Sequence, residues 1–313
     1  MNRLPSQTKM TVGTPRVRGV AREGQSLQKG LIPVLRRLFN NSLLTTIVVI
    51  IGLFWSVPTF GLFVSSFRPG NLIKTTGWWT GLVPPWYFTI ENYQQVLTAQ
   101  GLGQAFLNSL IIAIPGTLLP IAVGAFAAYA FAWMKFPGRD FIFLGIVTLL
   151  VIPSQIAFVP VLQLFTAIGI TGQYLAVWVA HTAFGLPFAI FLLRNFFAAL
   201  PSDLMEAARI DGASHLRIFW NVMLPLSVSS LASLAIFQFM WVWNDLLVSL
   251  IFLGGNPQYA PMTLTVANLV NSYGTNYQVL TAAAFISMVL PLAIFFSLQR
   301  YFVRGILAGS VKG

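Results

Sequence analysis

The sequence of 313 residues contains no cysteine, only two histidines and few charged side chains. Without cysteine there can be no disulfide bond or thiolate metal site, and two isolated histidines argue against a metal site built from imidazole. Charged residues make up 8% of the chain, whereas they make up about a quarter of a soluble domain. Hydrophobic residues make up 57%, and the mean hydropathy is +0.78. This composition excludes a soluble domain and predicts an integral membrane protein.

The chain also lacks a Gly-x-x-x-x-Gly-Lys-Ser/Thr segment, the loop that cradles nucleotide phosphates in many ATPases. It therefore cannot hold ATP in the usual way, and any energy from ATP must enter through another subunit. A nucleophile motif and a paired acidic site are absent as well, so an intramembrane enzyme that uses Asp245 and His181 as acid and base is the weakest alternative. We predict that the protein is not an enzyme and binds no cofactor itself.

Positive charge is concentrated at the N-terminus of a chain whose net charge is +11. The first 42 residues hold eight basic residues and one acidic residue, and residues 43–67 follow without any charge. This pattern is the positive-inside signal of a cytosolic N-terminus and not a nucleic-acid surface. Because the apolar run is too long for the core of a cleavable signal peptide, it is predicted to be a transmembrane helix.

Apolar runs long enough to cross a bilayer, about 20 residues each, recur along the chain. We predict an all-α, polytopic membrane protein with six transmembrane helices, at residues 43–67, 103–132, 141–165, 174–198, 226–253 and 279–300. With both termini in the cytosol, sixteen of the eighteen basic residues fall on cytosolic segments, as the positive-inside rule requires. Prolines predict kinked or interrupted helices in the second and third spans: Pro115, Pro120, Pro153 and Pro160.

A charged segment, residues 203–225, separates the fourth and fifth predicted spans. Asp203 can cap a short helix that Gly212 ends in the left-handed conformation, and Ser214 can cap a second helix. Four apolar residues share one face of this second helix: Leu216, Phe219, Trp220 and Met223. Two short helices with charge and large apolar side chains indicate either a plug for a partner protein or an amphipathic connector on the membrane surface.

The fifth predicted span is unusually polar. Gln238, Trp241 and Asp245 share a face at spacing i, i+3 and i+7, and Asn244 lies beside them. An ionisable residue in an apolar run is costly, which makes it a candidate site. The four residues could line the path of a sugar, whose C–H faces pack on indole rings and whose hydroxyls bond to amides and carboxylates. Hydrogen bonding between helices is the alternative.

Two segments are predicted to face the outside. Residues 68–102 are rich in tryptophan and proline, which indicates anchoring at the membrane interface or a landing surface for an external partner. Residues 254–278 carry no charge and many amide and aromatic groups. They could recognise a neutral polyol or simply connect two spans.

The charged segment also carries a resemblance. Glu206-Ala207-Ala208, followed by Gly212 and by Val222-Met223-Leu224-Pro225, resembles the EAA signature of permease subunits of ATP-binding-cassette (ABC) importers, although the family more often has Ile at the position of Val222. We call residues 203–225 the coupling loop. Other stretches are similar to the maltose-type carbohydrate permeases, and most to the six-span partner: Leu193 to Phe197, Pro201 to Asp203, Trp243 to Asp245 and Arg304 to Gly313.

This resemblance implies the permease fold of type I ABC importers and a role for each matching segment. A basic cytosolic tail (1–42) would precede the permease domain (43–303), and a second cytosolic tail (304–313) would follow it. The coupling loop would dock on an ATPase through Glu206, Ala207, Ala208, Asp211 and Gly212, to which the apolar face adds Leu216 and Phe219. The loop at 254–278 would meet an external solute-binding protein through Asn256, Tyr259, Asn271 and Tyr273.

The function implied is ATP-driven import of a neutral sugar, such as a disaccharide or a glucosyl osmolyte, across the bacterial plasma (inner) membrane. The expected partners are a second homologous permease, a solute-binding protein and a homodimeric cytosolic ABC ATPase, which would hold ATP and Mg. The alternative is an ATP-independent secondary sugar carrier. Such a carrier usually contains an inverted internal repeat, and the sequence shows none.

Overall fold

The computed structural model describes residues 23–98, 101–272 and 277–310, so parts of both predicted tails lie outside it. Its described residues form helices and no strand, which confirms the all-α class. In chain order the helices are α1 (Glu23–Ser66), α2 (Gly70–Thr75), the 3-10 helix η1 (Trp78–Leu82), α3 (Glu91–Thr98), α4 (Leu102–Trp133), α5 (Arg139–Leu149), α6 (Gln155–Ala167), α7 (Tyr174–Ala198), α8 (Ser202–Ile210), α9 (His215–Ile218), the π turn η2 (Phe219–Met223), α10 (Leu224–Leu226), α11 (Val228–Trp243), α12 (Leu247–Phe252), α13 (Met262–Ser272) and α14 (Tyr277–Ser310).

The chain divides into two compact units, Met1–Phe60 and Gly61–Gly313. The first unit contains most of α1. Every side chain of this helix from Ser42 to Phe60 is exposed, and the stretch is apolar on all faces. A helix that is apolar all round belongs in a hydrophobic medium, so this segment is suited to contact with lipid or with other membrane helices.

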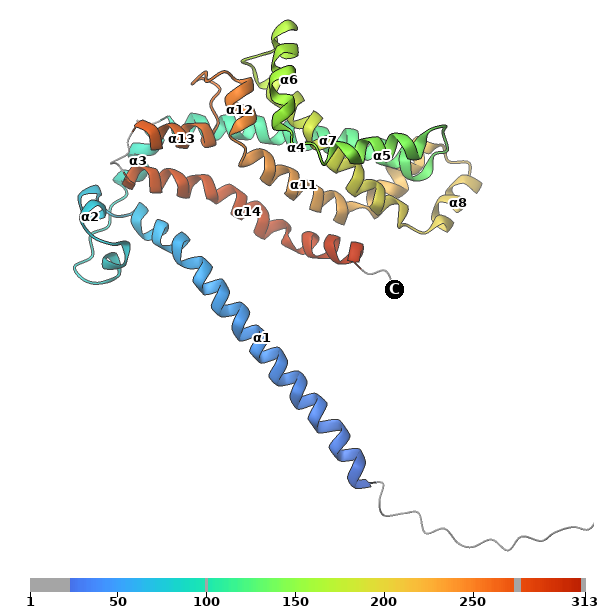
Figure 1. The fold of residues 1–313 in the computed structure, drawn as a ribbon, viewed down its shortest axis with the longest axis horizontal. Helices are drawn as coiled ribbons and strands as arrows, with labels where there is room; N and C mark the ends of the chain where they lie inside the picture. Colours follow the sequence, from blue (N-terminus) through green and yellow to red (C-terminus); the bar gives the residue numbers. More distant parts are fainter. Residues whose placement is uncertain (1–22, 99–100, 273–276, 311–313) are drawn as a thin grey trace, which may run out of the picture. The chain divides into compact units, whose positions relative to one another are not determined.

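The second unit is built around α4, α7, α11 and α14 (Figure 1). α4 packs along α7 and α11, and α11 packs along α14. Gly124 allows α4 and α7 to pack closely, because a Cβ atom there would lie only 2.8 Å from the Cβ of Ala189. Small residues at such crossings are typical of membrane helices.

Four predicted spans are confirmed by helices that are long and apolar enough to cross a membrane: Ser42–Ser66, Leu102–Trp133, Tyr174–Ala198 and Tyr277–Gln299. The number six is not confirmed within the described residues. The predicted span 141–165 consists of two shorter helices, α5 and α6, separated by residues 150–154. Pro153 accounts for the break, since proline lacks an amide hydrogen and disfavours helical geometry in the preceding residue.

The predicted span 226–253 is also divided. α11 ends at Trp243, and α12 begins only at Leu247. At its other end, α11 is bent by 76° relative to the helical segment His215–Leu226, and the two together count as a fifth possible span. The coupling loop therefore continues into the membrane helix through a sharp bend at Ser227.

Two hydrophobic cores lie within the second unit. The central core joins α4, α7, α11, α12, α13 and α14. The second, which we call the loop-side core, joins the last turns of α4 and α7 and the start of α11 to the coupling loop. Its buried members are Ala125, Ala128, Tyr129, Ala189, Leu193, Phe197, Met205, Ile218, Phe219, Met223 and Leu234.

Candidate functional site

The coupling loop begins within α8, which starts two residues earlier than a cap at Asp203 predicts. Ser202 follows Pro201, and Asp203 lies in the first helical turn, so the prediction that Asp203 caps the helix is wrong. Proline before a helix already has the required φ angle. Asp203 can still interact favourably with the positive end of the helix dipole.

The end of α8 agrees with the prediction. Gly212 has a φ of +75°, in the left-handed region that glycine adopts without steric cost. Its amide donates to the carbonyl of Arg209, and the amide of Ala213 donates to that of Ala208. These two bonds form the Schellman cap expected for a helix that ends at glycine.

The second half of the coupling loop differs from a simple amphipathic helix. Ser214 caps it as predicted, since its hydroxyl accepts a hydrogen bond from the amide of Arg217. After one α turn the backbone widens into η2, and the predicted apolar face is divided between two surroundings. Phe219 and Met223 are buried, whereas Leu216 and Trp220 are exposed. A π turn changes the angular spacing of side chains, so the pattern of an α-helix no longer keeps them on one face.

Phe219 was predicted to contact an ATPase, but it is only 2% exposed. Its ring stacks on Phe126 at 4.5 Å and meets Tyr129 edge to face at 5.5 Å. The Tyr129 hydroxyl lies 3.0 Å from Nδ1 of His215. Phe219 therefore attaches the coupling loop to α4 and does not lie on the surface that a partner would meet.

A second set of contacts ties α8 itself to the spans. Met205 is buried in the loop-side core. Arg209 donates to the carbonyl of Trp133 at the end of α4, and the indole of Trp133 donates to the carbonyl of Phe197 at the end of α7. A displacement of α8 would therefore also displace the ends of α4 and α7.

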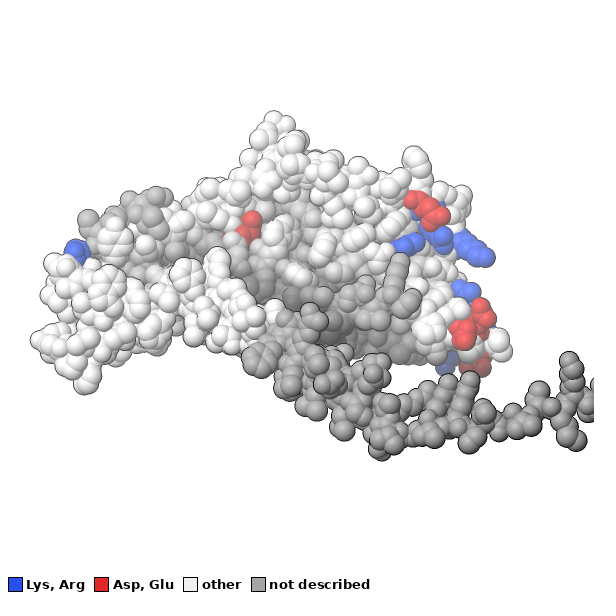
Figure 2. Space-filling view, turned by 60° about the horizontal axis from the view of Figure 1, so that its bottom comes forward, with Lys and Arg blue, Asp and Glu red and all other residues white. Residues whose placement is uncertain are grey.

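The opposite side of α8 faces outward. Glu206, Ala207, Asp211 and Gly212 are exposed, and Ala208 is half-buried. Ile210 was not predicted as a site residue, yet it is 86% exposed. On the face drawn in Figure 2, the coloured Lys, Arg, Asp and Glu side chains gather mainly at one end of the second unit, and the helix α8 contributes Asp203, Glu206 and Arg209. An exposed isoleucine on a helix that also carries exposed charged residues has the form of a docking surface, with an apolar centre and a polar rim.

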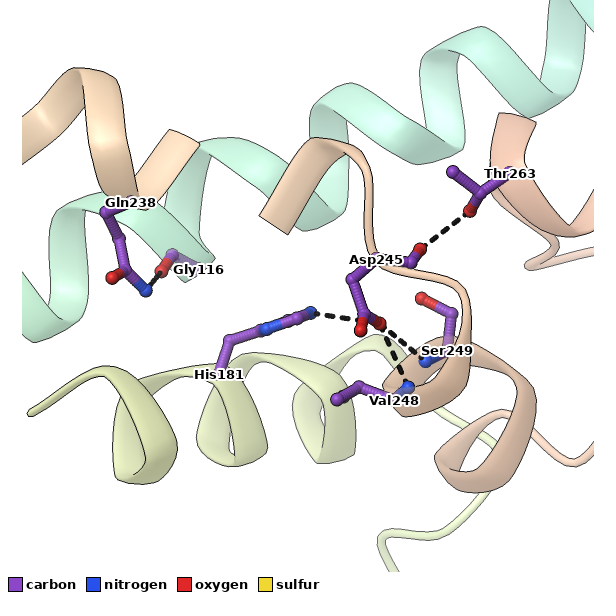
Figure 3. A network of polar contacts seen from close by, with 7 residues as sticks. All are labelled: Gly116, His181, Gln238, Asp245, Val248, Ser249 and Thr263. Atoms are coloured by element: carbon purple, nitrogen blue, oxygen red, sulfur yellow. Dashed lines mark hydrogen bonds and ion pairs between the residues drawn. The ribbon is translucent and has the colours of Figure 1, made fainter. Parts of the chain in front are cut away.

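The predicted polar face of α11 has a different structure (Figure 3). Gln238 is buried, and its amide donates to the carbonyl of Gly116 in α4 over 3.2 Å. It therefore holds two helices together and does not line a path. Trp241 is 39% exposed and meets the ring of His181 edge to face.

Asn244 and Asp245 lie in the break between α11 and α12. The amide of Asn244 donates to the carbonyl of Met240. Oδ2 of Asp245 accepts hydrogen bonds from the amides of Val248 at 2.9 Å and Ser249 at 3.4 Å, and its backbone carbonyl accepts one from Thr263. Asp245 therefore caps α12, in the way that short polar side chains replace backbone bonds at helix ends.

His181 faces Asp245 across this break. The ring is fully buried, and its Nε2 lies 4.0 Å from Oδ2 of Asp245. Neither ring nitrogen has a hydrogen-bond partner among the described residues. In the same part of the chain, no group of three His, Cys, Asp or Glu residues could hold a metal ion.

The segment after α12 is more ordered than a plain connector. The amide of Asn108 in α4 donates to the carbonyls of Gln258 and Ala260, and its carbonyl oxygen accepts from the Tyr174 hydroxyl. Asn256 accepts from the amide of Gln258 and shapes the turn. Much of the remainder forms α13, which packs on α4 and α14 and was not predicted.

The four residues predicted to meet a binding protein are not equivalent. Asn256 is exposed, whereas Tyr259 is half-buried and packs edge to face on Tyr174. Tyr273 and the side chain of Asn271 lie outside the described residues.

Comparison with known proteins identifies the family. The family described as "binding-protein-dependent transport system inner membrane component" matches residues 121–308, which include the whole coupling loop. The chain belongs to this family. The permease is therefore a transport component of the inner membrane and not an enzyme.

Two curated relatives are similar over most of the permease. It is 55% identical over 268 residues to the osmoprotective compounds uptake permease protein GgtD of Synechocystis sp.. This match covers 85% of this chain and 90% of GgtD. It is 53% identical over 239 residues to the alpha-glucoside transport system permease protein AglG of Rhizobium meliloti. That match covers 75% of this chain and 63% of AglG, so the permease spans less than two thirds of the length of AglG.

The fold has a counterpart among solved structures. A chain in the crystal structure of a bacterial ABC transporter involved in the import of the acidic polysaccharide alginate matches with a TM-score of 0.73, over 85% of this chain and 97% of that one. The two are 20% identical. The likeness confirms the fold of an ABC importer's membrane component.

Proposed function

We propose that this permease imports a small neutral sugar or glucosyl osmolyte with energy from a separate ATPase. It would form the path together with a second homologous permease. A homodimeric ABC ATPase, holding ATP and Mg, would dock on the coupling loop, and an external solute-binding protein would deliver the substrate. The names of GgtD and AglG, which refer to osmoprotective compounds and alpha-glucosides, support this substrate class.

The observation that carries the proposal is the two-sided construction of the coupling loop. One side presents Ile210 and the charges of α8 to the surroundings, and the other is buried in the loop-side core. Because close-packed interiors transmit displacement with little compression, a push on α8 would reach α4 and α7. Closure of the ATPase dimer would thereby move this subunit against its partner permease, and the path would open to one side of the membrane and then to the other.

The orientation follows from charge. The basic residues near the coupling loop, Lys135, Arg139, Arg194, Arg209 and Arg217, belong on the cytosolic side by the positive-inside rule. With six crossings, as the sequence predicts, both termini would lie in the cytosol. The same side is where an ATPase can obtain ATP.

A neutral substrate fits the polarity of the spans. The carboxylate of Asp245 is engaged by the amides of Val248 and Ser249. Trp241, which remains partly exposed, offers an indole face that can pack on a sugar ring. We therefore assign a stacking contact to Trp241 and a structural role to Asp245.

The coupling role can be tested by the ATPase activity of the complete transporter, stimulated by its sugar-loaded binding protein. Glu206→Lys, on the exposed side of α8, should abolish most of the stimulated turnover. Glu91→Lys changes charge equally at an exposed position in the first turn of α3, and it should leave turnover unchanged. Full stimulated turnover in the Glu206 variant would disprove the coupling role.

The energy source and the sugar need separate experiments. Uptake of radiolabelled glucosides should stop when the ATPase subunit is omitted, whereas a secondary carrier would continue to transport. A thermal-shift screen of neutral sugars and osmolytes on the cognate binding protein should identify the substrate. Stabilisation by charged sugars alone would contradict the proposed substrate class.

A further inference from the structure

Arg68 lies at the end of the first span, two residues after Ser66. An apolar helix of 25 residues is long enough to cross the hydrocarbon layer. The residues that follow it are therefore at the level of the lipid headgroups. The neighbouring aromatic side chains are exposed, as in the aromatic belts of membrane proteins: Trp79, Trp86, Tyr87 and Phe88.

The guanidinium of Arg68 is buried among neutral groups. The residue is 3% exposed. It donates to the carbonyl of Gly77 at 2.9 Å and to the hydroxyls of Thr76 at 2.6 Å and Thr80 at 2.9 Å. The ion pairs found in the described part of the chain, Arg139 with Asp140 and His181 with Asp245, do not include it.

This arrangement leaves a cation without a counter-ion. Burial lowers the pKa of Arg68. Removing a charge from water is costly, and an anion placed beside the guanidinium offsets part of the cost. Such an anion would have to come from outside the described residues.

The space for an anion is present. Arg68 lines a cavity of about 440 Å³, together with Thr76, Trp79, Thr80, Val83 and Tyr87. The two threonines whose hydroxyls bind Arg68 also line it, and Trp79 and Tyr87 add aromatic residues to the lining. Guanidinium groups bind phosphate, as they bind carboxylate, through two parallel hydrogen bonds of good geometry.

We propose that this cavity binds a phosphate ester, supplied by the headgroup of an anionic phospholipid. The position beside the end of a span and the exposed aromatic rings favour lipid over a soluble phosphate. The site would fix the loop between α1 and α4 to the membrane surface. The proposal depends only on the chain spanning a membrane, and not on which substrate the permease transports.

The test is lipid retention by the full-length protein, purified in detergent and examined by native mass spectrometry with phosphatidylglycerol or phosphatidylcholine added. The wild-type protein should retain phosphatidylglycerol preferentially. Arg68→Gln should weaken this retention about tenfold, as expected when charge-assisted hydrogen bonds to a phosphate are lost. Val83→Trp, which adds bulk to the lining of the cavity and leaves Arg68 intact, should weaken it as well.

Lys74→Gln is the matched control, because Lys74 is an exposed cation on the same loop and does not line the cavity. It should retain the lipid like the wild type. Equal retention by wild type, Arg68→Gln and Val83→Trp would overturn the proposal, as would an equal loss in Lys74→Gln. Displacement of the lipid by equimolar glycerol phosphate would overturn the lipid source. Loss of binding-protein docking in Arg68→Gln with lipid retention unchanged would overturn it too, because the anion would then be a protein carboxylate.

Discussion

Replacing Asp245 separates two roles that its carboxylate could have in transport. As a sugar ligand or an ion-pair partner it would need its charge. As the cap of α12 it needs only an oxygen that accepts from the amides of Val248 and Ser249. Asparagine keeps such an oxygen and alanine does not. We therefore predict that Asp245→Asn transports at close to the wild-type rate, whereas Asp245→Ala is impaired.

The magnitude follows from the lost cap. Replacing a capping Asp by alanine costs about 0.5–2 kcal/mol, and a buried amide left without an acceptor costs about 1–3 kcal/mol. These two costs overlap, because the unpaired amides are part of the cap, so Asp245→Ala should lose about 2 kcal/mol of stability. Thr263 donates to the backbone carbonyl of Asp245 in every variant, so Asp245→Asn should lose less than about 1 kcal/mol.

The assay combines sugar uptake at matched expression with thermal unfolding of the purified protein. Asp140 provides the control, since its carboxylate lies on the surface beside Arg139 and its Asn and Ala variants should behave alike. If Asp245→Asn is as defective in uptake as Asp245→Ala, the charge itself is required. In that case the capping argument fails, and His181 at 4.0 Å becomes the relevant partner.

Two further predictions concern the two faces of the coupling loop and the turn at residues 256–261, which Asn108 holds by hydrogen bonds. Phe219→Ala should destabilise the protein by about 3–5 kcal/mol, as for other buried aromatic residues, and lower its unfolding temperature. Leu216→Ala, at a 64% exposed position, should leave the unfolding temperature unchanged and reduce co-purification with the ATPase. A lower unfolding temperature with unchanged co-purification would contradict the conclusion that Leu216 faces outward and Phe219 inward. Asn108→Leu removes the donors to Gln258 and Ala260, so proteases should cut residues 256–261 faster than in the wild type. Unchanged cleavage would show that this turn is held by other contacts.

The long spans could be predicted from the sequence because length and apolarity are local properties. The helix α7 has the predicted bounds, and α4 differs from prediction by one residue at each end. The same reasoning failed for residues 141–165 and 226–253. Both are apolar enough for one crossing. Pro153 marks the break in the first segment, as predicted, whereas the break between α11 and α12 depends on which backbone groups find partners in the folded protein. Hydropathy contains no information on such partners.

The coupling loop shows the same division between local and tertiary information. Gly212 and Ser214 could be identified because capping depends on residues close in sequence. The burial of Phe219 could not, since it depends on the rings of Phe126 and Tyr129, some 90 residues earlier in the chain. The exposure of Ile210 was missed for the opposite reason, because an isoleucine gives no sign from sequence alone that its neighbours leave it uncovered.

The polar residues within the spans support a general conclusion about where sugar selectivity can arise in this permease. Asn108, Gln238, Asn244 and Asp245 were all potential sugar ligands by residue type, yet each forms hydrogen bonds with backbone carbonyls or amides. A polar group that is already bonded to the backbone has little to gain from a sugar hydroxyl, because it would exchange one hydrogen bond for another. The polarity of these four residues therefore serves to stabilise interrupted helices and tight connections. Under the proposed function, selectivity would then depend on partly exposed side chains such as Trp241 and on groups supplied by the proposed second permease.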